Sequence, residues 1–405
     1  MITRHEAYDL SQRNTFGMKV SCRLYVEVMD PEDLLTLDFD ALPQPVFIMG
    51  GGSNLLFTND FPGTILHMGN RFLHPFGVRN DRNAGAFVIP SEAKESVFVT
   101  AGAGVVFDDF CTWAASEGLW GPENLSLIPG EVGASAVQNI GAYGVEAKDI
   151  IETVHAFDRT TRSFVDIPVV ECGYGYRTSR FKTEWKGRYI ITAVTYRLST
   201  VPQPKLDYGG IRKALETRFP VKPGMTEGVK PGMTEDVKPG MMEGTKPEMK
   251  EIAVMPDLIG NLTPQMIRET VIAIREQKLP DPKETGSAGS FFCNPVISRE
   301  HFERIVETAR KENGPEYEVP HYEVGERIKV PAAWMIDQCG FKGAREGGAQ
   351  VYPKQPLVIV NATGNATPEE IVSLERRIID TIRNKYGIEL HPEVEHVGGQ
   401  PADNQ

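Results

Sequence analysis

The sequence predicts an α+β protein in three successive parts: a strand-rich front part to about residue 200, a connector over residues 201–284, and a back part over residues 285–395 that mixes helix and strand. Three observations support this division. Short apolar runs separated by glycines, typical of strands, fill the front part; helical patterns become more frequent in the back part; and a repeat that cannot pack interrupts the connector. Residues 396–405 are expected to form a tail.

The strands of the front part are expected in the runs PVFIMGGGSNLLF, ESVFVTAGAGVVF, IIETVHAFD and YIITAVTYRL. A helix is expected over residues 107–119, where apolar side chains recur near one face before a Gly-Pro pair. After the repeat, a helix is expected to begin at Thr263 and Pro264. Another is expected over residues 367–386, with a capping box of Thr367 and Glu370 at its start and Gly387 at its end.

The connector contains four copies of an eight-residue unit over residues 221–252, the first of which reads VKPGMTEG. A proline in every copy, followed by glycine in three of them, prevents a helix or a sheet ladder from continuing, and the Lys, Glu and Thr side chains bury little apolar surface. A mobile loop is therefore expected, and a role in binding a partner remains an alternative.

Composition excludes several classes of protein. The formal net charge of -12 argues against a protein that coats nucleic acid, and 40% apolar residues suit an ordinary globular protein. The longest apolar runs are shorter than the roughly 18 residues of a membrane helix, and the first residues lack the apolar core of a secretory signal, so a cytoplasmic protein is expected. Five dispersed cysteines and eight histidines at no ligand spacing predict neither a disulfide framework nor a metal site.

Glycine-rich segments are the first candidates for a ligand site. Gly50-Gly51-Gly52-Ser53-Asn54 follows an apolar run, and Gly102-Ala103-Gly104 follows another, but neither completes a dinucleotide-binding GxGxxG pattern. Such turns can offer backbone N–H groups to a diphosphate or can simply be tight turns, and both interpretations stay open. Residues 128–144 then alternate small and amide side chains, which lets the backbone approach a large flat ligand such as a buried flavin.

Eight strings occur in an order that is specific: GGGSNLL, IPG, QNIGAYG, GYRTSRFK, LPDPK, GSAGSFFCNP, AAWMIDQCGFKG and HPEV. In this order the sequence resembles the UDP-N-acetylenolpyruvoylglucosamine reductase (MurB) family, flavoenzymes of bacterial peptidoglycan precursor synthesis and hence of cell-wall biogenesis. The resemblance runs from Asn14 to about Val394 and leaves out the repeat and the tail.

The resemblance implies a fold and a reaction. The fold would be an FAD-binding domain of the vanillyl-alcohol-oxidase (PCMH) type in two lobes over residues 1–200, followed by the connector and a smaller α+β substrate-binding domain over residues 285–395. The enzyme would be an oxidoreductase, UDP-N-acetylmuramate dehydrogenase, which uses NADPH and FAD to reduce the enolpyruvyl ether of UDP-N-acetylglucosamine. Its partners would be small molecules, with no nucleic acid or membrane, and the chain would be a monomer.

The same resemblance implies the site residues. Arg177 would stabilise the negative charge that develops on the substrate, Ser290 would donate a proton to C2, and Glu393 would act with Arg177. The residues expected to bind the cofactor are Gly50, Gly51, Gly52, Ser53, Asn54, Leu55, Gly102, Pro129, Gly130, Ser135, Gln138, Asn139, Gly141, Ala142, Tyr143 and Gly144. Those expected to bind substrate are Tyr208, on a mobile loop that closes over the nucleotide, and Lys283, Asn294, Tyr322 and Gln355. The repeat would project away from this pocket.

Four positions depart from the family pattern: Gly51, Thr178, Cys293 and Ala333 stand where Glu, Asp, Lys and Gly are usual. Two other functions remain as alternatives. One is a catalytically silent relative that senses a UDP-sugar or flavin, and the other is a flavin oxidase built on the same FAD domain. Retention of Arg177, Ser290 and Glu393 opposes the first, and the GSFF and HPEV strings of the back part oppose the second.

Overall fold

The computed structural model describes residues 1–69, 86–90, 95–219 and 261–398. The eight-residue repeat and most of the predicted tail lie outside the described residues. The predictions that the repeat forms a mobile loop and projects away from the pocket therefore concern residues outside the described ranges. Within the described ranges, no helix is both long and apolar enough to cross a membrane.

The first sheet of the front part has the strand order β1-β2-β5-β3. β1 pairs antiparallel with β2, while β2 and β3 lie parallel to β5 on either side of it. The strands span Ile2–Asp9 (β1), Ser21–Val28 (β2), Val46–Met49 (β3) and Phe61–Met68 (β5). β3 ends at Met49, so the glycine-rich turn over residues 50–54 directly follows the end of this strand.

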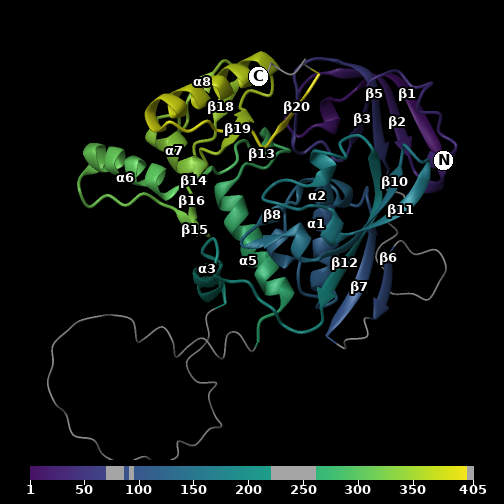
Figure 1. Ribbon diagram of the computed structural model, residues 1–405, viewed down its shortest axis with the longest axis horizontal. Coiled ribbons are helices and arrows are strands. Elements are labelled where there is room, and N and C mark those ends of the chain that lie inside the picture. Colours follow the sequence, from purple (N-terminus) through teal and green to yellow (C-terminus); the bar gives the residue numbers. More distant parts are fainter. Residues whose placement is uncertain (70–85, 91–94, 220–260, 399–405) are drawn as a thin grey trace, which may run out of the picture.

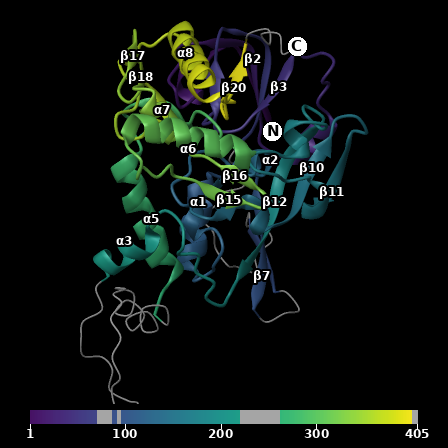
Figure 2. The same cartoon turned by 60° about the vertical axis from the view of Figure 1, so that its left-hand side comes forward.

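The second sheet is antiparallel, in the order β11-β10-β12-β7-β6. Its strands span Ala86–Pro90 (β6), Ser96–Gly102 (β7), Ile151–Asp158 (β10), Ser163–Pro168 (β11) and Tyr189–Ser199 (β12), and the short strands β8 (Gly141–Ala142) and β9 (Val145–Glu146) form a separate pair. Helices α1 (Phe107–Ser116) and α2 (Val132–Gln138) accompany this sheet, and α2 packs against β12 and β7. Figures 1 and 2 show both helices near the centre of the molecule.

The back part contains a four-stranded antiparallel sheet and a three-stranded sheet, with helices around them (Figure 1). The strands are β13 (Gly286–Ser290), β17 (Arg345–Glu346), β18 (Ala349–Val351) and β19 (Val358–Asn361) in the first, and β14 (Val296–Ser298), β15 (Tyr322–Val324) and β16 (Arg327–Lys329) in the second. The helices of the back part are α6 (Arg299–Asn313), α7 (Ala332–Gln338) and α8 (Pro368–Tyr386). The connector adds α3 (Ile211–Arg218) and α5 (Pro264–Lys278).

The end of the chain returns to the front part. β20 (Glu395–Val397) pairs in parallel with β4 (Leu55–Phe57), the strand that follows the glycine-rich turn. The same hydrophobic cluster buries Phe57 of the front part and Phe291 and Ile378 of the back part. Because they share a core, the residues on either side of the junction are held in fixed positions.

The elements expected from periodicity are present in the structure. α8 begins with the predicted capping box, in which the Thr367 hydroxyl accepts from Glu370 N and the Glu370 carboxylate accepts from Thr367 N. α5 begins at Pro264, and α1 ends at Ser116, three residues before the predicted end. Helix α2 was not predicted from the sequence, because its residues VGASAVQ show no apolar stripe.

Candidate functional site

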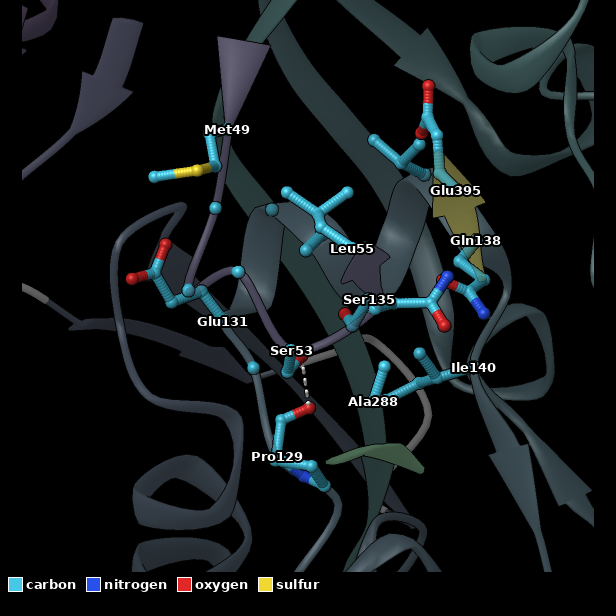
Figure 3. Close-up of a pocket in the computed structure, with 18 of the residues that line it drawn as sticks. Met49, Ser53, Leu55, Pro129, Glu131, Ser135, Gln138, Ile140, Ala288 and Glu395 are labelled. Atoms are coloured by element: carbon cyan, nitrogen blue, oxygen red, sulfur yellow. Dashed lines mark hydrogen bonds between the residues drawn. The ribbon is translucent and has the colours of Figure 1, made fainter. Parts of the chain in front are cut away.

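A cavity of about 660 Å³ lies where the front and back parts meet. Five segments that are distant in sequence line it: the turn after β3 (50–55), the segment before and within α2 (128–138), the Arg177 turn, the end of β13 (288–290) and the segment that leads into β20 (392–395). Figure 3 shows side chains from four of these segments around this pocket. The proposed catalytic residues Arg177, Ser290 and Glu393 all belong to the lining.

Arg177 lies at the tip of a tight turn over residues 175–178. Gly175 and Thr178 exchange two backbone hydrogen bonds, and Arg177 has a positive φ of 57°, a conformation that non-glycine residues adopt mainly where the surroundings impose it. Its Nη2 donates to Gly141 O at 2.6 Å. Nε lies 3.1 Å from Glu393 Oε1, yet this buried N–H has no hydrogen-bond partner in the described chain. The guanidinium is therefore fixed with a donor to spare.

Glu393 is held by backbone pairing and by an amide side chain. Its N donates to Phe291 O at 2.8 Å, and Gln138 Nε2 donates to its Oε1 at 2.9 Å. Asn54 Nδ2 in turn donates to Gln138 Oε1 and to the Glu393 carbonyl, at 2.7 and 3.0 Å. The glycine-rich turn, α2 and the end of the chain are thus joined by one hydrogen-bond network around the carboxylate.

Ser290 ends β13 next to a bulge. The register of β13 against β19 shifts between Ser287 and Ser290, and Gly289 between them has φ +72°. A bulge of this kind changes the direction of the following side chain. In the part of the chain that is described, no hydrogen bond engages the Ser290 hydroxyl, so it is available to a ligand in the cavity.

The cavity wall suits a flavin dinucleotide. Glycines bring the backbone close to the space: a Cβ on Gly130 would lie 2.7 Å from Ser53 Oγ, and one on Gly141 would lie 3.2 Å from Arg177 Nη1. Apolar residues of β3 and β12 line another part of the wall and can pack on a flat ring. Arg177, which belongs to the lining, adds a cationic group beside the same space.

Three cationic side chains of the lining were not predicted from the sequence: Lys182, Lys186 and Arg275. Arg275 lies on α5, its Nε has no hydrogen-bond partner among the described residues, and burial lowers its pKa. Positive charges in this position can compensate a diphosphate. The only sequence signal for Arg275 was its place on the predicted helix, one turn before the LPDPK string.

Comparison with known proteins decides the family. A model of an FAD binding domain matches residues 24–162, and a model of the UDP-N-acetylenolpyruvoylglucosamine reductase C-terminal domain matches residues 281–397. The chain is 40% identical to the UDP-N-acetylenolpyruvoylglucosamine reductase of Bacteroides fragilis (strain YCH46) over 97% of this chain and 99% of the relative, and 38% identical to that of Porphyromonas gingivalis (strain W83) over 96% and 98%. The chain belongs to the UDP-N-acetylenolpyruvoylglucosamine reductase family.

The fold agrees with this membership. The crystal structure of the MurB reductase from Thermus caldophilus superposes with a TM-score of 0.58 at 20% identity, covering 98% of this chain and 99% of that one. The resemblance drawn from the motifs and the expected fold class are confirmed. The reductase relatives and the match to an FAD binding domain confirm the expected oxidoreductase class and FAD as a cofactor.

Four residues that we expected to bind the cofactor do not line the cavity: Gly102, Asn139, Tyr143 and Gly144. Asn139 is fully buried, and its Nδ2 donates to Gly175 O at 2.8 Å, so it holds the Arg177 turn. Tyr143 and Gly144 pack against the loop that carries Tyr208. The other twelve expected cofactor residues all belong to the lining.

The expected substrate residues divide into two groups, none of which lines the cavity itself. Tyr208 and Tyr322 are partly exposed, and their rings stack with centroids 5.7 Å apart. Asn294 Nδ2 donates to the hydroxyl of Tyr176, whose ring lies 5.6 Å from the Arg177 guanidinium. Lys329 Nζ lies 5.1 Å from the ring centroid of Tyr176 and 5.7 Å from that of Tyr322, so these residues form one group beside the Arg177 turn. Lys283 and Gln355 make no described side-chain contact with it.

The remaining expectations concern cysteines and metals. Burial, and next the charge of Glu393, raise the pKa of Cys293 to about 11, which keeps the thiol protonated and poorly reactive. All five cysteines are free. Among the described residues, no group of three or more His, Cys, Asp or Glu side chains could hold a metal ion.

Proposed function

We propose that this chain is the reductase that converts the enolpyruvyl ether of UDP-N-acetylglucosamine into UDP-N-acetylmuramate, with Arg177, Ser290 and Glu393 as its catalytic residues. One observation supports this proposal most strongly: Arg177, Ser290 and Glu393 line one cavity together with the glycine-rich turn. Each of the three lies more than 100 positions from the next in the sequence. We also propose the domain division given above, a monomeric state and a cytoplasmic location.

When bound, FAD supplies the redox chemistry, taking two electrons and a proton from NADPH and passing them to C3 of the enolpyruvyl group. The residues of this chain do the rest. The glycines at 50–52, 130 and 141 let the backbone approach the ring system, and Lys182, Lys186 and Arg275 supply positive charge for a diphosphate.

Arg177 stabilises the charge that develops when C3 is reduced. That charge spreads from C2 into the neighbouring carboxylate, for which a planar guanidinium is a suitable bidentate partner. The turn over residues 175–178 and the bond to Gly141 O hold the guanidinium before the substrate arrives, so little reorganisation is needed. Glu393, 3.1 Å from Arg177 Nε, orients it and balances its charge.

Ser290 donates the proton to C2. An alcohol is a weak acid, but a carbanion at C2 is a strong base, so the transfer is downhill. The bulge at Gly289 directs the Ser290 side chain, and its hydroxyl is free to contact the substrate carbon. The stacked Tyr208 and Tyr322 lie outside the cavity, where they can hold the nucleotide end of the substrate.

The test is anaerobic stopped-flow spectroscopy of the flavin absorbance in Ser290→Ala. NADPH should bleach this variant at the wild-type rate, while recolouring by the enolpyruvyl UDP-sugar should slow by roughly 10²- to 10⁴-fold, the usual contribution of a general acid. Ser163→Ala, which removes an exposed hydroxyl on β11, is the matched control.

Each alternative function gives a different result. Recolouring of Ser290→Ala at the wild-type rate would exclude Ser290 as the proton donor. A wild-type protein that recolours with oxygen but not with the UDP-sugar would be an oxidase, and a protein that NADPH does not bleach would be a sensor.

A further inference from the structure

A buried histidine lies between two carboxylates at the wall of the cavity. His67 of β5 has a side chain 5% exposed; its Nε2 lies 3.0 and 3.2 Å from the two carboxylate oxygens of Glu131, and its Nδ1 lies 3.4 Å from Glu27 Oε1. Arg13 Nη2 lies 3.8 Å from the same Glu27 oxygen. We call Glu131, His67 and Glu27 the His67 cluster. The reaction derived above uses none of its members.

The hydrogen-bonding capacity of these groups explains how the cluster is joined. A neutral imidazole has one donor and one acceptor nitrogen, whereas an ionised carboxylate only accepts. Both ring nitrogens face carboxylates, so His67 links Glu131 to Glu27 through its two sides. Tyr25, whose ring centroid lies 6.2 Å from that of His67, completes the surroundings on the side of β2.

Glu131 is the member that reaches the cavity. It immediately precedes α2, and a Cβ on Gly51 would lie 3.6 Å from its Oε1, which places the carboxylate beside the glycine-rich turn. Figure 3 shows Glu131 and Gln138 at opposite sides of the pocket. In the described part of the chain, His67 is the one side chain that donates to Glu131. A carboxylate can accept about four hydrogen bonds, so most of this capacity remains for a ligand.

A fixed carboxylate selects the chemistry of what lies against it. It repels phosphate and accepts hydrogen bonds from hydroxyl or amino groups. The cationic side chains Lys182, Lys186 and Arg275 line the same cavity and suit the diphosphate. The Glu131 end is therefore suited to a part of the cofactor that carries donors and no charge.

We propose that Glu131 binds hydroxyl or amino donors of FAD and that His67 is a positioning residue that holds the Glu131 carboxylate at the cavity wall. The proposal rests on the placement of FAD in this cavity. Donors of this kind occur in two parts of FAD, the ribityl chain and the adenosine half. FMN retains the ribityl chain and lacks the adenosine, so a comparison of the two flavins separates these sources.

The experiment is equilibrium dialysis of the full-length protein against FAD and against FMN, for wild type, Glu131→Gln, His67→Gln and the double variant. Glu131→Gln keeps the size of the side chain and replaces a charge-assisted acceptor by a neutral one, so FAD binding should weaken about tenfold. His67→Gln should also weaken it, and the double variant should bind no more weakly than Glu131→Gln. Glu117→Gln, which alters an exposed carboxylate at the end of α1, is the control.

The double variant separates positioning from general structural support. If His67 acts through Glu131, its replacement costs nothing further once Glu131 is replaced; if it only supports the fold, the two effects multiply. Equal losses for FAD and FMN assign the ribityl chain, and a loss for FAD alone assigns the adenosine half. If thermal unfolding shows that His67→Gln does not fold, His67→Asn takes its place in the cycle.

The Glu131 proposal and the placement of FAD in the cavity are overturned by different results. An FAD dissociation constant for Glu131→Gln within twofold of wild type, or multiplicative effects in the double variant, overturns this proposal. Ala134→Trp, which fills the cavity from α2, tests the placement of FAD. If that variant folds and binds FAD as tightly as wild type, the cofactor lies elsewhere and the proposed function fails with it.

Discussion

Glu123 is a buried carboxyl group whose ionisation should destabilise the protein. It begins a short 3₁₀ helix (Glu123–Leu125), is 2% exposed, and accepts a hydrogen bond from Gly121 N at 2.6 Å. Burial raises its pKa from 4.5 to about 7. The next residue, Asn124, donates to the carbonyls of Tyr143 and Lys205, close to the Tyr208 loop. Loss of order here would therefore reach the proposed nucleotide end of the site.

The sign and size of the effect follow from the raised pKa. Below pH 4.5 the group is protonated in the folded and the unfolded chain, and it has no effect on the pH dependence. As the pH rises from 4.5 towards 7, the unfolded chain ionises while the folded chain keeps the buried carboxyl protonated, so stability falls. Above pH 7 the folded chain ionises as well, and the loss levels off. At roughly 1.4 kcal/mol per tenfold change, a rise of the pKa from 4.5 to about 7 corresponds to about 3 kcal/mol at pH 8.

Glu123→Gln keeps an acceptor for Gly121 N and cannot ionise. We expect the variant to exceed wild type in free energy of unfolding by about 3 kcal/mol at pH 8 and by roughly 1 kcal/mol at pH 5. Urea unfolding followed by far-UV circular dichroism at both pH values measures this. Glu117→Gln, at an exposed position, should show no such dependence. A variant that gains the same amount at both pH values, or loses stability at pH 8, would refute the reasoning.

Two further predictions concern the network around the carboxylate and the packing of α5. Gln138→Met removes the donor to Glu393 Oε1 while keeping the length of the side chain. In steady-state assays of NADPH oxidation, we expect kcat to fall about 10- to 100-fold with a smaller change in KM. An unchanged kcat would contradict the role of this hydrogen bond. Arg268 on α5 makes two hydrogen bonds, of 2.6 and 2.9 Å, to Asp108 on α1, and both side chains are largely buried. Arg268→Met should lower the free energy of unfolding by about 3–5 kcal/mol, because it leaves the Asp108 carboxylate with the Leu127 N–H but without its guanidinium partner. Adding Asp108→Leu should recover much of that loss, and a double variant as unstable as the single one would refute this explanation.

Local signals in the sequence were sufficient for the elements that depend on neighbouring residues. The capping box at Thr367 and Glu370 and the stripe on α5 predicted their helices, because capping and amphipathicity act over a few positions. Helix α2 was missed because its small residues carry little periodic signal; its packing against β12 and β7 stabilises it. The order of short motifs indicated the family, which the comparisons confirm.

The sequence by itself thus predicted several strands of the front part, three of the helices and the family, and it proposed three catalytic side chains. Only the tertiary structure decided that Gln138 holds Glu393, that Asn139 supports the Arg177 turn instead of lining the cavity, and that His67 meets Glu131. The reason is the range of the forces. Helix caps and apolar stripes are set by residues three or four positions apart, whereas these contacts join strands and turns 36 to 255 positions apart, and only the shared core of the front and back parts brings them together.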